Sequence, residues 1–104
     1  MSGDVISIGP GKIALLEAIG ETRSITAAAK AMGMSYRRAW ILVDEMNTSL
    51  ARPAVASTTG GERGGSSALT EVGVKLVALY RRIEARAERA AAADIERLLT
   101  LLAR

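Results

Sequence analysis

Two short helical segments joined by a glycine turn limit the folds open to this chain. The segment 25–32 (ITAAAKAM) follows Ser24, a residue type that caps helix N-termini, and precedes Gly33, the type that most often ends helices. Ser35 then supplies a second cap, for a longer segment over about 36–50. Because two helices joined by three or four residues that include a glycine pack at a steep angle, this spacing predicts a helix-turn-helix.

Apolar residues recur at helical spacing on both sides of the turn. Ahead of it, the segment from Gly11 to Gly20 repeats apolar residues at three-residue steps, which predicts a first helix that stops at Gly20. A short strand is expected over residues 5–8. The segment 36–50 carries one apolar stripe and is closed by Pro53. The stripe comprises Ala39, Trp40, Val43, Met46 and Leu50, so we expect Trp40 in the core.

After Pro53 the composition changes from helical to strand-like. Two short runs that suit strands flank the stretch 60–65 (GGERGG), and together they predict a β-hairpin over about 53–69. Thr70 then caps a last helix over about 70–103, helped by Glu71 in its first turn. An apolar stripe that continues to the end of such a helix predicts a partner surface. The last members of this stripe are Ile95, Leu98, Leu99 and Leu102.

The composition excludes most catalytic and metal-binding chemistry. The chain has 104 residues without Cys or His, which removes disulfides, Cys/His zinc sites, thiol nucleophiles and imidazole bases. With no cluster of convergent titratable groups, we expect no enzyme, no metal and no cofactor. The length fits a single domain over 1–104. No apolar block is long enough for a membrane span or leader, which predicts a cytoplasmic protein without membrane contact.

The order of the elements predicts a mainly α fold with a small β-hairpin, a winged helix-turn-helix with a long C-terminal dimerisation helix. In that fold the third helix presents its first turn to the major groove of DNA. Here that turn carries Ser35, Tyr36, Arg37 and Arg38, whose guanidinium groups can pair with the edge of guanine. The formal net charge of +3 permits nucleic acid binding but does not require it.

Further candidate DNA contacts flank this turn. Ser24 and Thr26 begin the second helix, where backbone N–H groups and hydroxyls can hold a phosphate. Arg63, at the hairpin tip, could reach a minor groove. Plainer interpretations exist: solvated arginines, serines that only cap helices, a flexible tip, and Tyr36 as a lid on the core. We favour DNA contact for the paired arginines because a turn precedes them.

Several blocks of the sequence resemble the N-terminal DNA-binding domain of the bacterial ModE-type, molybdate-responsive transcriptional regulators. They are 9–19 (GPGKIALLEAI), 24–29 (SITAAA), 34–40 (MSYRRAW), 45–47 (EMN), and the glycine-rich stretch that begins at Thr59 and leads to Leu69, Thr70 and Gly73. The resemblance covers about residues 8–87. The SYRRAW block and the glycine-rich wing are specific, whereas the Ala-rich second helix is shared with LysR-type regulators.

The resemblance implies a dimer in which the first and last helices form the interface and the third helix enters DNA. The implied interface residues are Ile13, Leu16, Tyr80, Ile83, Ile95, Leu98, Leu99 and Leu102. Family members also carry a C-terminal pair of small β-barrels that bind molybdate or tungstate. This sequence shows no strand-rich segment after the hairpin, so it resembles a single-domain form in which molybdate binding is not expected.

The function expected from these features is sequence-specific binding of double-stranded DNA, as a homodimer on a palindromic operator, by a transcriptional regulator. The alternative is a winged-helix module that binds another protein and not a specific DNA sequence. Asp44, Glu45 and Glu62 favour this alternative because they place negative charge near the expected DNA face.

Overall fold

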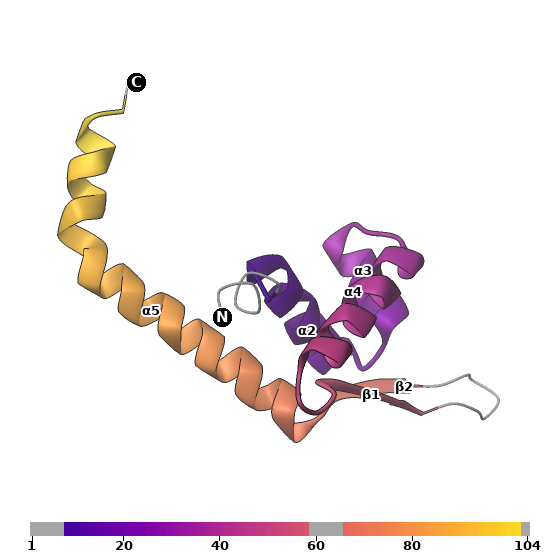
Figure 1. The fold of residues 1–104 in the computed structure, drawn as a ribbon. Coiled ribbons are helices and arrows are strands. Elements are labelled where there is room, and N and C mark those ends of the chain that lie inside the picture. The colour runs from indigo at the N-terminus through magenta and orange to yellow at the C-terminus, as the bar shows by residue number, and fades with distance from the viewer. Residues whose placement is uncertain (1–7, 59–65, 103–104) are drawn as a thin grey trace.

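The computed structural model describes residues 8–58 and 66–102 and shows a winged helix from which a long C-terminal helix projects (Figure 1). The helices are α2 (Pro10–Thr22), α3 (Ile25–Met32), α4 (Tyr36–Ser49) and α5 (Glu71–Thr100), and the antiparallel strands β1 (Val55–Thr58) and β2 (Ser66–Leu69) form the wing. The fold expected from the order of the elements is thus confirmed. The expected strand over 5–8 lies outside the described residues, except for Ile8 in a turn.

Helix α2 begins one residue earlier and ends two residues later than the sequence predicts. Pro10 occupies the first turn, where its missing N–H costs nothing. The helix ends because Arg23 adopts a left-handed conformation with φ of 60°, and its N–H bonds to the carbonyl of Ile19. Gly20 is inside the helix, where a Cβ would lie 3.1 Å from Leu69 Cδ1. Its role is therefore close packing against β2, and the prediction of a stop at Gly20 is wrong.

The helix-turn-helix forms as its caps predict. The Ser24 hydroxyl accepts the N–H of Ala27 at 3.0 Å, and the Ser35 hydroxyl accepts the N–H of Arg38 at 3.1 Å. Gly33 ends α3 with φ of 71°, a conformation that glycine adopts without strain. Helix α4 ends at Ser49, one residue before the predicted end.

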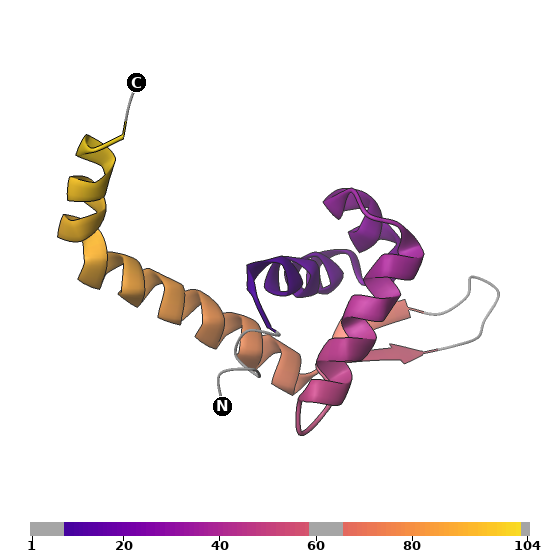
Figure 2. The same ribbon diagram turned by 45° about the horizontal axis from the view of Figure 1, so that its top comes forward.

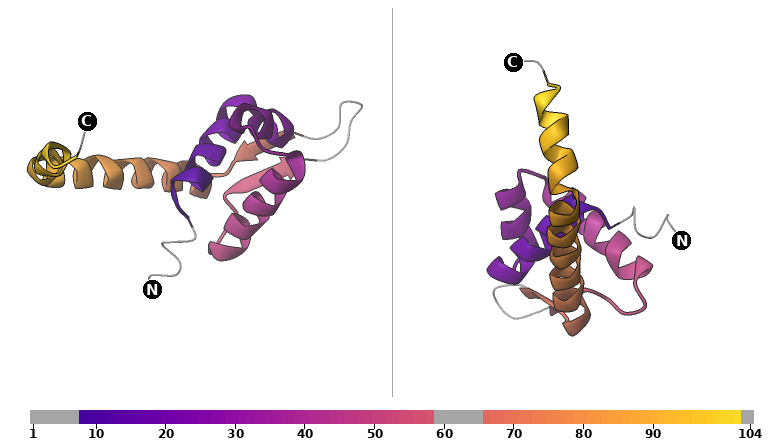
Figure 3. Two further views of the ribbon diagram at one scale, coloured as in Figure 1. Left: turned by 90° about the horizontal axis from the view of Figure 1, so that it is seen from above. Right: turned by 90° about the vertical axis from the view of Figure 1, so that its left-hand side faces the viewer.

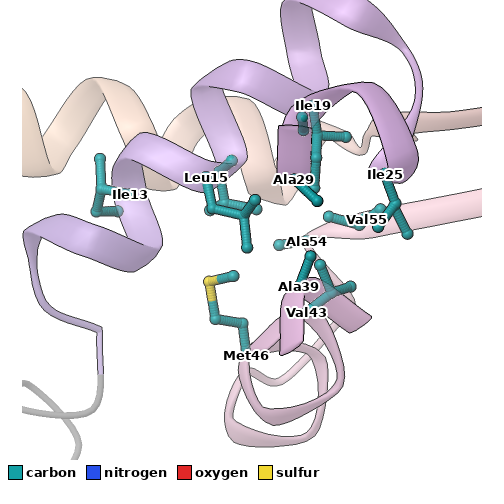
Figure 4. Packing of buried hydrophobic residues seen from close by; sticks show 12 residues of the cluster. Ile13, Leu15, Ile19, Ile25, Ala29, Ala39, Val43, Met46, Ala54 and Val55 are labelled. Atoms are coloured by element: carbon teal, nitrogen blue, oxygen red, sulfur yellow. The ribbon is translucent and has the colours of Figure 1, made fainter. Parts of the chain in front are cut away.

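The core is formed where α2, α3, α4 and the base of the wing meet (Figure 4). Alanines on α3 and α4 let these helices approach α2 closely, and Met46 fills the space between α4 and α2. The buried apolar residues are Ile13, Leu15, Leu16, Ile19, Ile25, Ala28, Ala29, Ala39, Val43, Met46, Ala54 and Val55.

Asn47 ties the base of the wing to α4. Its Oδ1 accepts the N–H groups of Ala54 at 2.8 Å and Val55 at 3.1 Å, and its Nδ2 donates to the carbonyl of Val55 at 3.2 Å. These bonds pair backbone groups of two buried residues that precede or begin β1. The wing therefore has a fixed position relative to the turn that precedes α4.

Helix α5 starts against the wing and then leaves the body. Thr70 caps it by accepting the N–H of Gly73 at 3.1 Å, while its hydroxyl donates to the Pro53 carbonyl at 2.7 Å. Farther along, Arg81 contacts Glu17 on α2, and beyond this point α5 extends away from the other helices (Figures 2 and 3). The radius of gyration of 16.6 Å exceeds the roughly 13 Å of a compact chain of this length because of this projection.

Candidate nucleic-acid interface

The first turns of α3 and α4 and both strands of the wing enclose a cleft of about 210 Å³. Tyr36 and Trp40 contribute its aromatic wall, one helical turn apart on α4. The remaining lining is mostly hydroxyl groups, from Ser24, Thr26, Ser57, Thr58, Ser66 and Ser67, together with Ile25. Hydroxyls and the exposed start of a helix are groups that commonly contact DNA phosphates.

The cleft brings together three of the predicted DNA contacts. Ser24, Thr26 and Tyr36 line it, and Thr26 and Tyr36 are exposed. Ser35 is also exposed but lies outside the cleft lining, with its hydroxyl occupied by the cap of α4. Arg63 falls outside the described residues.

Arg37 and Arg38 are both exposed, on different sides of α4. Successive residues of a helix point about 100° apart, so the two guanidinium groups leave the helix in different directions. Arg38 lines a second hollow, of about 350 Å³, beside Lys12 and Met34. Within residues 8–58 and 66–102, neither arginine has a carboxylate within ion-pair distance, so both keep their hydrogen-bond donors available.

Trp40 is not a core residue, contrary to the sequence prediction. Its exposed fraction is 42%, and its ring lines the cleft. The buried face of α4 is made by Ala39, Val43 and Met46, and Trp40 points about 60° to 120° away from these side chains around the helix. Because of this angular offset, Trp40 lies outside the apolar stripe that packs into the core.

The outer face of α4 contains two further exposed side chains, Asp44, whose charge favoured a protein partner, and Ile41, for which the sequence predicted no role. Both point roughly opposite Ala39 and Met46, which the helical period alone could have revealed. Glu45, which had favoured a protein partner, forms an ion pair with Lys12 at 3.2 Å. Part of the negative charge near α4 is therefore balanced within the chain.

The predicted dimer residues fall into two groups. Ile13 and Leu16 are fully buried in the core of one chain, so they have no surface to offer a second chain and this assignment must be corrected. The others lie on α5 or just after it, and except for the half-buried Tyr80 they are exposed. We define the apolar face of α5 as Leu79, Tyr80, Ile83, Ile95, Leu98, Leu99 and Leu102.

Part of this face forms a groove close to the body. Leu79, Tyr80 and Ile83 line it with Leu76 and Ile8, and it encloses about 240 Å³. Gly73 is the one fully buried residue of α5, whereas Leu76, Val77 and Tyr80 are partly covered by the body, and the helix beyond residue 91 is exposed in a single chain.

Neither a metal site nor a membrane segment is found in the described parts of the chain. Over residues 8–58 and 66–102 no three acidic side chains converge in a way that could hold a metal ion. No helix over these ranges combines the length and apolarity needed to cross a bilayer.

Comparison with known proteins identifies relatives of this fold, although no protein-family model matches the chain. Molybdenum-pterin-binding protein MopB of Rhodobacter capsulatus is 50% identical over 78 residues, which is 75% of this chain and 29% of the relative. Molybdenum transport protein ModE of Azotobacter vinelandii is 44% identical over 73 residues, 70% of this chain and 27% of the relative. Over about 70% of its length, this chain is homologous to ModE-type proteins.

A third ModE-type relative carries a name that states its activity. The DNA-binding transcriptional dual regulator ModE of Escherichia coli K12 is 41% identical over 71 residues, 68% of this chain and 27% of the relative. The chain thus spans less than a third of the length of these ModE-type proteins. Their names describe regulation, transport or molybdenum-pterin binding, and none names an enzyme.

Proposed function

We propose that this chain binds double-stranded DNA in a sequence-specific manner and acts as a transcriptional regulator without catalytic activity. In this proposal the first turn of α4 enters the major groove and Arg37 or Arg38 pairs with guanine. The start of α3, with Ser24 and Thr26, holds the adjacent phosphates.

The observation that carries the proposal is the set of suitable groups around the first turn of α4. The first turn of α4 exposes two arginines that lack an ion-pair partner among the described residues, and the hydroxyl-lined cleft lies beside it. Such a combination of cationic forks for base edges and hydroxyls for phosphates suits a duplex. The name of the Escherichia coli relative supports the same function.

We further propose a homodimer held by the apolar face of α5, acting on a palindromic site. A 30-residue helix with a single buried residue leaves an apolar surface that a second copy would cover. Two copies related by twofold symmetry would place their α4 helices in successive major grooves, about 34 Å apart.

Selection of duplexes from a random pool, followed by fluorescence anisotropy at two salt concentrations, tests this function. We expect one enriched palindromic sequence, bound at least a thousandfold more tightly than random DNA, with an affinity that falls steeply with salt as counterions are released. If no sequence is enriched, the chain is not a specific DNA-binding protein. The exposed Asp44 and the apolar residues of α4 would then point to a protein partner.

A further inference from the structure

Two large apolar side chains stand on the exposed part of α4. The exposed fractions are 42% for Trp40 and 48% for Ile41. Removing such side chains from water is favourable, and a single copy of this chain leaves both of them exposed to water. The side chains around Trp40 and Ile41 indicate which kind of partner would cover them.

Trp40 and Ile41 flank the direction in which Arg37 points. With about 100° per residue, Ile41 lies about 40° from Arg37 on one side and Trp40 about 60° on the other. Both are about one turn farther along the helix, where side chains spaced by three or four residues are surface neighbours. A docking that places Arg37 on base edges therefore brings both apolar side chains to the next base pairs.

The surroundings of these side chains suit a duplex better than an apolar partner. Two arginines that have no ion-pair partner among the described residues precede them on α4, and the cleft that contains Trp40 is lined mostly by hydroxyls. In the major groove the apolar group on a base edge is the C5-methyl of thymine. Asp44, the next residue on this face, is compatible with a duplex because a carboxylate can accept from the amino group of cytosine.

We propose that Trp40 and Ile41 read thymine methyl groups in the half-site, next to a guanine read by arginine. This inference rests on the proposed function and adds the base that the apolar side chains select. Trp40 covers a methyl group from the side of the cleft, and Ile41 covers one on the outer side of α4.

Replacement of thymine by deoxyuridine tests this directly, since it removes the methyl group and leaves base pairing intact. The probe is the duplex enriched from the random pool, with each thymine of a half-site replaced in turn. We expect about a fourfold loss of affinity at one or more positions, as burial of one methyl-sized group implies. Equal affinity for every substituted duplex overturns the inference.

Variants of the chain assign the effect to the two side chains. Some thymines lower the affinity of the wild type about fourfold when deoxyuridine replaces them. At each of these positions the replacement should have no effect in either Trp40→Ala or Ile41→Ala, because that variant lacks the side chain that contacts the methyl group. A penalty that persists in both variants overturns the assignment. Circular dichroism verifies that both variants fold. If Trp40→Ala does not fold, Ile41→Ala alone tests the assignment, since Ile41 does not line the cleft.

A matched control and the selection step separate this inference from the proposed function. Val74 is an exposed β-branched residue on α5, away from α4, and Val74→Ala should keep the full deoxyuridine penalty. If the selection enriches a sequence that binds tightly but ignores the methyl groups, only the present inference fails. If it enriches none, the proposed function fails first and this inference falls with it.

Discussion

The guanidinium of Arg81 on α5 donates two hydrogen bonds to the carboxylate of Glu17 on α2, from Nε to Oε2 at 3.0 Å and from Nη2 to Oε1 at 2.6 Å. A third bond joins its Nη1 to Glu84 on the same helix at 2.8 Å. The hydrogen bonds and charge of Arg81 lower the pKa of Glu17 below its ordinary value, against a smaller opposing effect of burial. The pair fixes α5 to the body at the last point before the helix projects.

The Glu17–Arg81 pair predicts a specific dependence of stability on pH. A carboxyl whose pKa is lowered by folding stabilises the protein above the ordinary glutamate pKa of about 4.3, and this contribution is lost as the pH falls through the lower folded pKa. Glu17→Gln should therefore be less stable than the wild type at pH 7, with the difference shrinking below about pH 4. Because both side chains are about two fifths exposed, solvent screens the pair and the difference should be small.

Urea unfolding at several pH values and one protein concentration measures this difference. Glu21→Gln is the control, because Glu21 is an exposed residue of α2 that forms no ion pair within the described part of the chain. A difference between the wild type and Glu17→Gln that stays constant down to pH 3 would contradict the role of the pair.

Removal of the Asn47 side chain should loosen the wing. Asn47→Ala leaves the N–H groups of Ala54 and Val55 without their acceptor, and an unsatisfied buried donor costs about 1 to 3 kcal/mol. We expect a loss of about 2 to 3 kcal/mol in the free energy of unfolding, measured by denaturant titration. Thr48→Ala, next to it, should cost under about 0.5 kcal/mol, because the exposed Thr48 bonds only within its own helix. Equal effects of the two substitutions would refute the role of Asn47.

Glycine-to-alanine substitutions at two helical positions should have opposite effects. At Gly73 a Cβ would overlap the carbonyl oxygen of Ala54, so Gly73→Ala forces α5 away from the wing and should cost about 1 to 3 kcal/mol. At Gly11 a Cβ meets no atom within 4 Å, so Gly11→Ala should be neutral or stabilising by up to about 1 kcal/mol. Thermal unfolding compares the two, and a Gly73→Ala variant as stable as the wild type would show that the contact is not close in solution.

The proposed dimer predicts that charge on α5 separates the two copies. Leu98→Asp together with Leu99→Asp places carboxylates in the apolar face of α5, where they would lose hydration in an interface. Sedimentation should show monomers that bind the enriched palindrome much more weakly than the wild type. Because both leucines are exposed in a single chain, the body should stay folded. Persistence of dimers would place the interface elsewhere.

Local signals made the helix-turn-helix predictable from the sequence. The caps at Ser24, Ser35 and Thr70 depend on bonds that span only three residues, so their sequence pattern suffices. The end of α2 depends instead on tertiary structure. The carbonyl of Arg23 accepts the N–H of Ser67 on β2 at 3.0 Å, and this long-range contact helps hold a non-glycine residue in the left-handed conformation.

The candidate site was predictable in part for the same reason. The arginines could be selected because they follow a turn, which is a local feature. The exposure of Trp40 could not be inferred from its hydrophobicity, because it depends on how Ala39, Val43 and Met46 fill the contact of α4 with α3 and α2. The burial of Ile13 and Leu16 likewise follows from the packing of other helices against α2, which leaves only the apolar face of α5 for the proposed dimer.

The central claim is that α4 carries sequence-specific DNA binding, and two charge-matched double variants test it most directly. Arg37→Ala with Arg38→Ala removes two positive charges from α4, and Arg82→Ala with Arg86→Ala removes two from the exposed surface of α5. Anisotropy with the enriched duplex should show a loss of about 2 to 5 kcal/mol for the first pair and a much smaller loss for the second. Equal losses would mean that general charge attraction, and not base reading by α4, accounts for binding.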